Sequence, residues 1–348
     1  MFAGVPGVVQ ADDGGASARP QDHAPISVMG DHTHKAGEVM FSLRTMHMDM
    51  EGNRIGTNDV SPEQIVTGVP NVHFGQPMQP ATLRVVPTKM TMDMIMAGAM
   101  YAPRDWLTLM AMGSYVRKEM DHITFQGGAG TNVLGGFTTK SDGFGDTKLT
   151  GLIRLYEKDG HHVHLNAGIS LPTGSITQSD DVLTPMNTRP RLRLPYAMQL
   201  GSGTFDFLPG VTYTGGHGDL GWGAQASGTV RLGENDEDYS FGDVARLTVW
   251  GAYSWADWLS TSLRLSGEHE GRIDGSDAAI VAPVQTANPA FYGGERVALA
   301  AGVNLLGSDG GLQGHRLGLE VEVPVYQNLN GPQMDRDWTV SVGWQKAF

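Results

Sequence analysis

The sequence has no cysteine, no long apolar run and no excess of basic residues. The absence of cysteine among 348 residues is compatible with the periplasm and the outer membrane, where a stray thiol risks mispairing. The chain is 40% hydrophobic, but no stretch approaches the roughly 18 uninterrupted apolar residues of a membrane helix, which excludes a helical membrane protein. Its net charge of −13 argues against nucleic acid as a partner, because such binding needs a basic footprint.

What is present instead is an alternating pattern, clearest at the end of the chain. One set of alternate residues is mostly large and apolar: Trp338, Val340, Val342, Trp344, Lys346 and Phe348. The intervening set is small or polar: Thr339, Ser341, Gly343, Gln345 and Ala347. A period of two is typical of a β-strand. In a soluble sandwich the apolar face would point to a core, whereas in an outer-membrane barrel it points to lipid and the polar face to a wet lumen.

Similar segments recur and predict about twelve strands. They cover residues 38–50, 84–101, 106–118, 143–156, 161–171, 203–213, 220–232, 241–255, 258–270, 294–306, 312–326 and 337–348. Short turns at 102–105, 157–160, 215–218, 256–257 and 307–311 all fall at the end that holds Phe348, and most other connections are long. Short periplasmic turns and long external loops are typical of bacterial barrels. We therefore predict an all-β fold over residues 38–348: a single up-and-down antiparallel transmembrane β-barrel in the bacterial outer membrane, surrounded by lipid.

The N-terminal residues have a different composition. Residues 1–11 resemble the end of a secretory signal peptide, with a short apolar run and a small residue at Ala11, although a basic n-region is missing. Residues 12–37 are rich in Asp, Gly, Ser, Pro and His. We expect this segment to be flexible, or to form a short segment tucked into the barrel mouth.

The polar faces of the strands predict a charged lumen. The lumen-lining candidates are Lys148, Arg154, His162, His164, Arg231, Arg246, Arg264, Glu268, Arg296, Arg316, Glu320 and Glu322. These residues suit a charged eyelet that selects solutes. They suit equally a salt-bridged filling of a narrow barrel.

Methionine and histidine suggest a metal site. The chain has 18 Met and 12 His, and thioethers favour Cu(I) while His-x-His can chelate a divalent cation. Copper is the only cofactor that the sequence suggests, and its candidate ligands are His32, His34, Met46, Met48 and Met50.

Methionine as apolar filler is the alternative to a metal site. Asp93 must avoid lipid, which would turn Met90, Met92, Met94 and Met96 toward lipid. On the first strand, Phe41 and Leu43 favour Met46, Met48 and Met50 inside with Arg44, whereas His47 and Asp49 favour the opposite parity. A bulge could reconcile the two patterns.

Two segments resemble a known family. Residues 165–175 contain Leu-Pro-Thr-Gly at the end of a strand, and residues 200–213 contain Leu-Gly-Ser-Gly-Thr followed by Pro-Gly. Both are similar to a family of outer-membrane transporters named after the meta-cleavage pathway of phenol degradation. The resemblance implies a barrel that passes hydrophobic or aromatic compounds. The aromatic end of the chain, with Trp344 and Phe348, also resembles the signal that the barrel assembly machinery recognises, from which Lys346 departs.

An outer-membrane phospholipase is the competing class. It would need a Ser/His pair near the lipid face, but Ser260 and Ser262 are predicted to point inward and no Gly-x-Ser-x-Gly motif occurs. The sequence therefore predicts a passive channel for small molecules and not an enzyme. A copper-associated outer-membrane protein and a structural barrel with a filled lumen are the alternatives.

Overall fold

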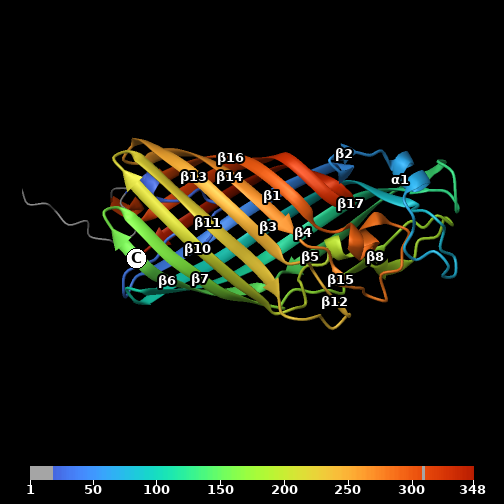
Figure 1. Ribbon diagram of the computed structural model, residues 1–348, viewed down its shortest axis with the longest axis horizontal. Coiled ribbons are helices and arrows are strands. Elements are labelled where there is room, and N and C mark those ends of the chain that lie inside the picture. Colours follow the sequence, from blue (N-terminus) through green and yellow to red (C-terminus); the bar gives the residue numbers. More distant parts are fainter. Residues whose placement is uncertain (1–18, 308–309) are drawn as a thin grey trace, which may run out of the picture.

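The computed structural model describes residues 19–307 and 310–348, and its main feature is a closed antiparallel barrel (Figure 1). Within these residues, eleven labelled strands follow one another around the wall in chain order, and β1 pairs with β17 to close it. The strands are β1 (Val39–Gly56), β3 (Val85–Arg104), β4 (Leu107–Phe125), β6 (Thr147–Lys158), β7 (His161–Leu171), β10 (Asp206–His217), β11 (Leu220–Arg231), β13 (Val244–Ala256), β14 (Leu259–Glu270), β16 (Gly294–Leu306) and β17 (His315–Ala347). This confirms the predicted up-and-down barrel.

β17 contributes two spanning segments to the wall. Its 33 residues would extend for roughly 110 Å if straight. Instead the element folds back on itself, so that its two ends meet. There the amide of Ala347 donates to the carbonyl of Gly314 at 3.3 Å. Its first part pairs with β16 as far as Leu329, and its second part pairs with β1 from Leu329 onward. The wall therefore has twelve spanning segments, as the alternating pattern predicts.

One side of the wall is taller than the rest because of β5 (Val133–Phe144), which lies outside the closed ring. β4 pairs with β6 from Leu107 to Met112 and with β5 from Tyr115 to Phe125. β5 and β6 therefore follow the same edge of β4 and are interrupted only at residues 145–146. Residues 119–142 lie between two predicted strands and were expected to form a loop, which is wrong for the part that forms β5. The free edge of β4 supplies hydrogen-bond partners that a weak alternating pattern does not reveal.

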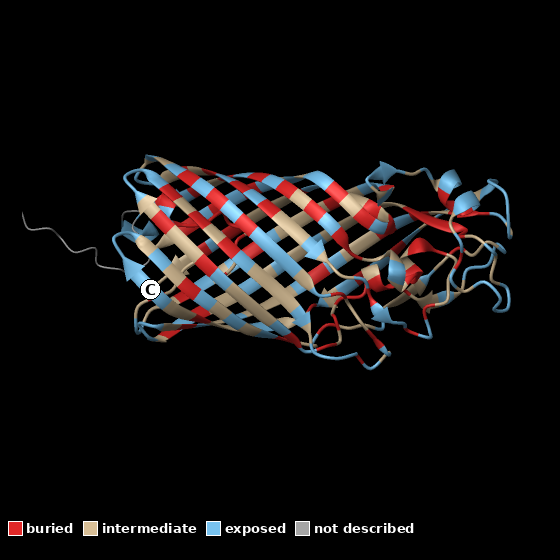
Figure 2. Ribbon diagram, in the orientation of Figure 1, coloured by how far each residue is buried: buried red, intermediate tan, exposed pale blue. Residues whose placement is uncertain are grey.

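Buried and exposed residues alternate along the strands (Figure 2). On β17, Trp338 and Trp344 are exposed while Gly343 and Gln345 are buried. On β7, Leu165 and Ile169 are exposed apolar side chains on the outer face. An outward apolar band next to an inward polar face is the arrangement that a bilayer requires.

The short turns meet at one end of the barrel. Backbone hydrogen bonds link neighbouring turns and strand ends around this rim: Gly37 to Ala102, Gly216 to Gly160, Ser254 to Asp219, Leu306 to Trp258 and Ala347 to Gly314. The C-terminus lies at the same end (Figure 1). This rim is the predicted periplasmic side.

Long connections cover the opposite mouth. They contain α1 (Pro62–Gly68), β2 (Asn58–Asp59), β8 (Ser179–Asp181), β9 (Arg191–Arg193), β12 (Tyr239–Ser240), β15 (Asp274–Gly275), and the 3-10 helices η2 (Tyr196–Met198), η3 (Gln285–Ala287) and η4 (Pro289–Phe291). We call residues 172–205 and 271–293 the cap. Its Tyr196, Ile280 and Val284 form a buried cluster with Val85 at the start of β3 and with Tyr239.

The polar stretch at 51–82 contains an unpredicted helix. Ser61 caps α1 through a capping box with Gln64, and Pro62 fits the first turn. Ile65 and Val66 are buried in a cluster with residues of β3 and β4. In the described part of the chain, no helix is long and apolar enough to cross a membrane.

Candidate functional site

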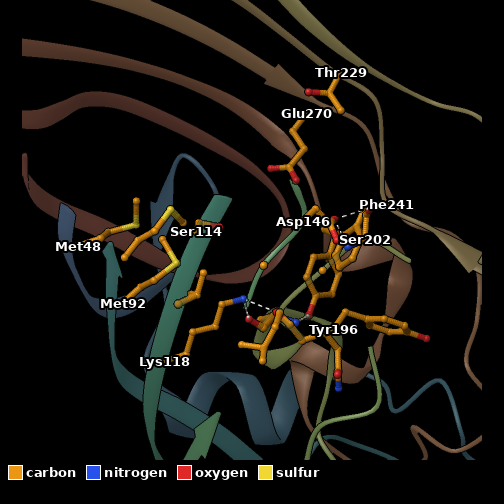
Figure 3. Close-up of a pocket in the computed structure, with 18 of the residues that line it drawn as sticks. Met48, Met92, Ser114, Lys118, Asp146, Tyr196, Ser202, Thr229, Phe241 and Glu270 are labelled. Atoms are coloured by element: carbon orange, nitrogen blue, oxygen red, sulfur yellow. Dashed lines mark hydrogen bonds between the residues drawn. The ribbon is translucent and has the colours of Figure 1, made fainter. Parts of the chain in front are cut away.

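A cavity of about 510 Å³ lies inside the outer part of the barrel, under the cap. Figure 3 shows that its lining has two sides of different chemistry, with Met48 and Met92 on one and Asp146, Ser202 and Glu270 on the other. We call this cavity the chamber.

Methionines of four neighbouring strands, β17, β1, β3 and β4, form one side of the chamber. Across β1 and β3, Met46 pairs with Met94, Met48 with Met92 and Met50 with Met90. The methionines that line the chamber are Met48, Met50, Met90, Met92, Met94, Met96, Met112, Met120 and Met334. We call them the methionine wall. Because the thioether is flexible and polarisable, this wall offers an apolar surface that can adapt to differently shaped ligands.

The expectation that Met90, Met92, Met94 and Met96 face lipid is wrong, and Asp93 shows why. Its side chain points outward, where its carboxylate lies 2.6 Å from Nδ1 of His47. Asp93 is about 11 residues from the periplasmic end of β3, which is about 28 Å along the membrane normal for a tilted strand, beyond an apolar band of about 25 Å. Asp93 therefore lies at headgroup level, and the methionines next to it face the lumen.

The same parity resolves the conflict on the first strand. Met46, Met48 and Met50 share the inward face with buried Arg44, and the pairing of β1 with β17 changes register between Asp49 and Met50. The inward choice for these methionines is therefore correct.

Paired charges line the other side of the chamber. Arg231 contacts Asp206 at 2.6 Å, and Arg296 contacts Glu270 at 3.4 Å. Lys148 also lines this side. Charges that are neutralised by neighbours leave hydrogen-bonding groups without a strong net field, so this side suits polar substituents of a mainly apolar solute.

The cap forms the roof of the chamber and is held by specific bonds. Lys118 on β4 donates to the carbonyls of Ala197 and Gln199 at 2.9 and 2.6 Å. The amide of Ala197 donates to the hydroxyl of Tyr292 at 3.0 Å. Burial raises the pKa of the Tyr292 hydroxyl, which therefore remains neutral. The cap residues that line the chamber, among them Tyr196, Phe291 and Tyr292, carry no charge.

The two family-like segments meet at Asp146, in the break between β5 and β6. One carboxylate oxygen of Asp146 accepts from the amide of Gly174, and the other accepts from the amide and hydroxyl of Ser202. A Cβ atom on Gly174 would lie 2.6 Å from Cα of Gly201, so the two segments touch backbone to backbone. The resembling motifs are thus a structural junction at the edge of the chamber.

Residues 19–37 enter the barrel from the periplasmic end, and we call them the plug. Pro20–Asp22 form η1 at the rim, where Arg19 donates to the carbonyl of Gly218 at 2.8 Å. The chain then crosses the bore and returns to the rim, where the amide of Ala36 donates to Asp105. Ala24, Ile26 and Val28 are at most 5% exposed. The described part of this segment is therefore packed inside the bore, while residues 1–18, including the expected signal-peptide remnant, lie outside the described residues.

The lumen side chains satisfy the irregular backbone of the plug. Its carbonyls accept from barrel residues as follows: Pro20 from Ser260, Ala24 from Arg316, Val28 from Arg44, Met29 from Gln225, Gly30 from His164, and His34 from Arg154. Backbone without regular structure cannot be buried unless its polar groups find partners. Three of the predicted lumen residues, Arg154, His164 and Arg316, thus hold the plug in place.

The other predicted lumen residues occupy three places. Arg264 contacts Glu320 and Glu322 near the plug, and the amide of Ser27 donates to Glu320. Glu268 contacts Arg246, Arg296 and Arg336. His162 is 46% exposed and lies 3.7 Å from Glu157 at the rim. The Arg264 group therefore lies beside the plug, whereas the Glu268 group reaches the chamber lining through Arg296 and Arg336.

The metal candidates are divided between two places. His32 and His34 lie in the plug, whereas Met48 and Met50 line the chamber and Met46 lies beside them on β1. The structure instead brings His23 and Asp31 to His32. No spacing rule points to His23, because an irregular loop has no fixed period.

The chain terminus lies at the periplasmic rim. Trp344 is exposed on the outer face, and Phe348 packs edge-to-face on Phe41 at 6.1 Å between ring centroids. Nζ of Lys346 lies 4.8 Å from the centroid of the Phe348 ring. Lys346 is therefore close to the headgroups and not deep in the apolar band.

Similar structures confirm the fold. No known family model matches the chain, and no curated protein does so at a significant level. An outer membrane channel from Pseudomonas putida F1 is similar with a TM-score of 0.59 at 12% identity, covering 93% of this chain and 100% of that one. Weaker matches include a Pseudomonas aeruginosa FadL homologue (TM-score 0.44, 9% identity, 89% and 90% coverage) and the P. putida toluene transporter TodX (0.44, 8%, 89% and 89%). The chain has the fold of an outer-membrane channel.

Proposed function

We propose that the protein is an outer-membrane channel for the passive passage of small molecules with an apolar or aromatic body. The chamber carries this proposal: its volume of about 510 Å³ lies within the roughly 300–1,000 Å³ of small-molecule sites. The methionine wall would hold the apolar body, and the paired charges opposite would accept a polar substituent. The P. putida channel with the same fold supports passage as the role.

The plug and the cap would act as the two gates of this route. The cap lies above the chamber, and the plug fills the bore between the chamber and the periplasmic rim. A solute would enter the chamber from the outer side and would leave when the plug moves. In this proposal the charged residues of the lower bore hold a gate, and they do not select ions.

Binding of an apolar fluorophore tests the chamber. Purified protein in detergent is titrated with 1-N-phenylnaphthylamine, whose fluorescence rises in apolar surroundings. The variant Met92→Gln/Met94→Gln should bind about tenfold more weakly, because two apolar contacts of about 0.7 kcal/mol each are lost. Met78→Gln/Met186→Gln is the matched control, since those two methionines are 91% and 69% exposed on outer loops.

Passage is then measured with liposomes that contain the protein and an enclosed fluorophore acceptor. Wild type and control should admit the probe faster than empty liposomes, and the Met92→Gln/Met94→Gln variant should be slower. Equal affinity of both double variants would contradict the chamber as the binding site. Liposomes no faster than empty ones would favour the structural barrel with a filled lumen.

We further propose that Trp344 and Phe348 form the signal by which the barrel assembly machinery recognises the chain. Both are aromatic, lie on the outer face and are exposed at the rim where the last strand ends. A partner in the membrane can therefore reach them before the barrel closes.

A further inference from the structure

Three histidines of the plug come together inside the barrel. The ring centroids of His23 and His32 are 5.7 Å apart, and those of His32 and His34 are 4.9 Å apart. His23 lies on the limb of the plug that enters the bore, and His32 and His34 lie on the limb that returns. His23, Asp31 and His32 each offer a ligand atom within 4.8 Å of the others.

Each of these histidines has one buried ring nitrogen without a hydrogen-bond partner. The atoms are Nδ1 of His23, Nε2 of His32 and Nε2 of His34. His23 is 6% exposed and His34 is 1% exposed. An unpaired buried polar atom costs about 1–3 kcal/mol, so three of them in one cluster require an explanation.

The opposite nitrogens of two of these rings are held by carboxylates. Nδ1 of His32 lies 2.9 Å from Asp31, and Nδ1 of His34 lies 3.2 Å from Glu38. A carboxylate at Nδ1 fixes the proton there and leaves the lone pair on Nε2. This is the usual arrangement around a histidine that binds a metal, and it makes the ligand more basic.

We propose that His23, Asp31 and His32 bind one divalent transition-metal ion, Zn²⁺ or Cu²⁺, and that His34, whose ring packs against that of His32, completes the site. Imidazole nitrogens and a carboxylate oxygen suit both ions. Glu38 is a positioning residue that acts through His34. The methionine wall is not part of this site.

The charges around the histidines also fit a bound cation. Arg316 is an opposing charge close to His23, but its guanidinium is held by the carbonyl of Ala24 and by Asn304 and Gln345. The negative charge of Asp31 faces the histidines and offsets it.

The ion would join the two limbs of the plug. His23 and His32 are separated by eight intervening residues, so a shared metal closes the loop between them. Closing this loop should stabilise the docked plug beyond its hydrogen bonds and packing contacts. This inference is independent of the solute that the chamber takes.

Metal titration of the full-length protein tests the site. Protein purified in detergent is stripped with a chelator and titrated with ZnCl₂ and with CuCl₂ by calorimetry. Wild type should bind one equivalent, and His32→Gln/His34→Gln should bind on the order of 100-fold more weakly. The matched control His162→Gln/His269→Gln removes two exposed histidines and should bind like wild type.

Two further measurements separate a lost ligand from a disturbed plug. Glu38→Gln keeps all of the proposed ligands and should weaken binding by about 10–100-fold, because only the orientation of His34 changes. The Cu²⁺ form of wild type should show nitrogen couplings from imidazole in its electron paramagnetic resonance spectrum. Equal metal binding by wild type and His32→Gln/His34→Gln, or a Cu²⁺ spectrum without nitrogen couplings, would overturn the proposal.

Discussion

Asp146 holds together two loop segments that are distant in sequence. Its carboxylate accepts from the amides of Gly174 and Ser202 at 2.9 and 2.7 Å, and both of these residues are buried. Carboxylates bonded to buried amides form strong, charge-assisted hydrogen bonds. The Asp146 side chain therefore holds the two ends of cap segment 172–205 together beside the barrel wall.

Removal of this carboxylate should loosen the cap. Asp146→Ala leaves two buried amides without an acceptor, and we expect a loss of about 3 kcal/mol in the free energy of unfolding. Asp146→Asn should lose less, because one acceptor oxygen remains. Urea unfolding in detergent measures both, and Asp257→Ala at an exposed periplasmic turn is the control. A loss for Asp146→Ala no larger than that control would show that the junction does not support the cap.

Single residues also mark where sequence reasoning fails. The expectation that Asp93 faces the lumen rested only on the cost of placing a charge in hydrocarbon. The depth of Asp93 along β3 decides which face it can occupy, and counting residues from the turn at 102–105 would have placed it above the apolar band. The contacts of His23 have no comparable signal, because its neighbours depend on the path of an irregular segment.

At the scale of elements, the plug fits against glycines of β17. A Cβ atom on Gly318 would lie 2.8 Å from Cβ of Ile26, and one on Gly343 would lie 2.7 Å from Cγ1 of Ile26. Because Ile26 occupies the adjacent space, these two inward positions have no room for a larger side chain than that of glycine. The plug is packed as tightly as a protein core.

Enlarging one of these glycines should displace the plug. Gly318→Val should lower the free energy of unfolding by about 1–3 kcal/mol through overpacking. Ile26→Ala should restore part of this loss in the double variant, since it frees the space that valine needs. Thermal unfolding followed by circular dichroism measures the three variants. Gly267→Val is the control, because a Cβ atom there meets nothing within 4 Å.

The result that would count against tight packing is equal destabilisation by Gly318→Val and Gly267→Val, or no recovery in the double variant. Either result would assign the loss to β-strand geometry and not to contact with Ile26.

Elements with strong alternation were predictable, and the others were not. β7 and β16 begin and end where the pattern places them, at His161–Leu171 and Gly294–Leu306. β5 and α1 were missed, because Gly-rich and polar residues form them only where β3 or β4 supplies partners. The plug was ambiguous for the same reason: composition describes its polarity but not the barrel side chains that satisfy its backbone.

At the scale of the whole molecule, the barrel closes where its first and last strands meet. β1 and β17 pair from Met40 and Ala347 at the rim upward, and the amide of Phe348 donates to the carbonyl of Val39 at 2.8 Å. This side of the barrel can form only after the whole chain has been made. The sequence predicts this closure, because short connections at one end and long connections at the other are typical of a closed up-and-down barrel.

The terminal aromatic residue should matter for assembly more than for stability. Phe348 is 66% exposed, so Phe348→Ala removes little buried surface and should refold from urea into detergent like wild type. In bacteria the same variant should yield several-fold less folded barrel in the outer membrane, measured by heat-dependent mobility on gels. Phe205→Ala, which removes an aromatic ring that is 49% exposed outside the strands, should leave the amount unchanged. Equal losses in detergent refolding and in cells would mean that Phe348 stabilises the closed barrel itself, whereas a loss only in cells is the outcome expected of a recognition signal.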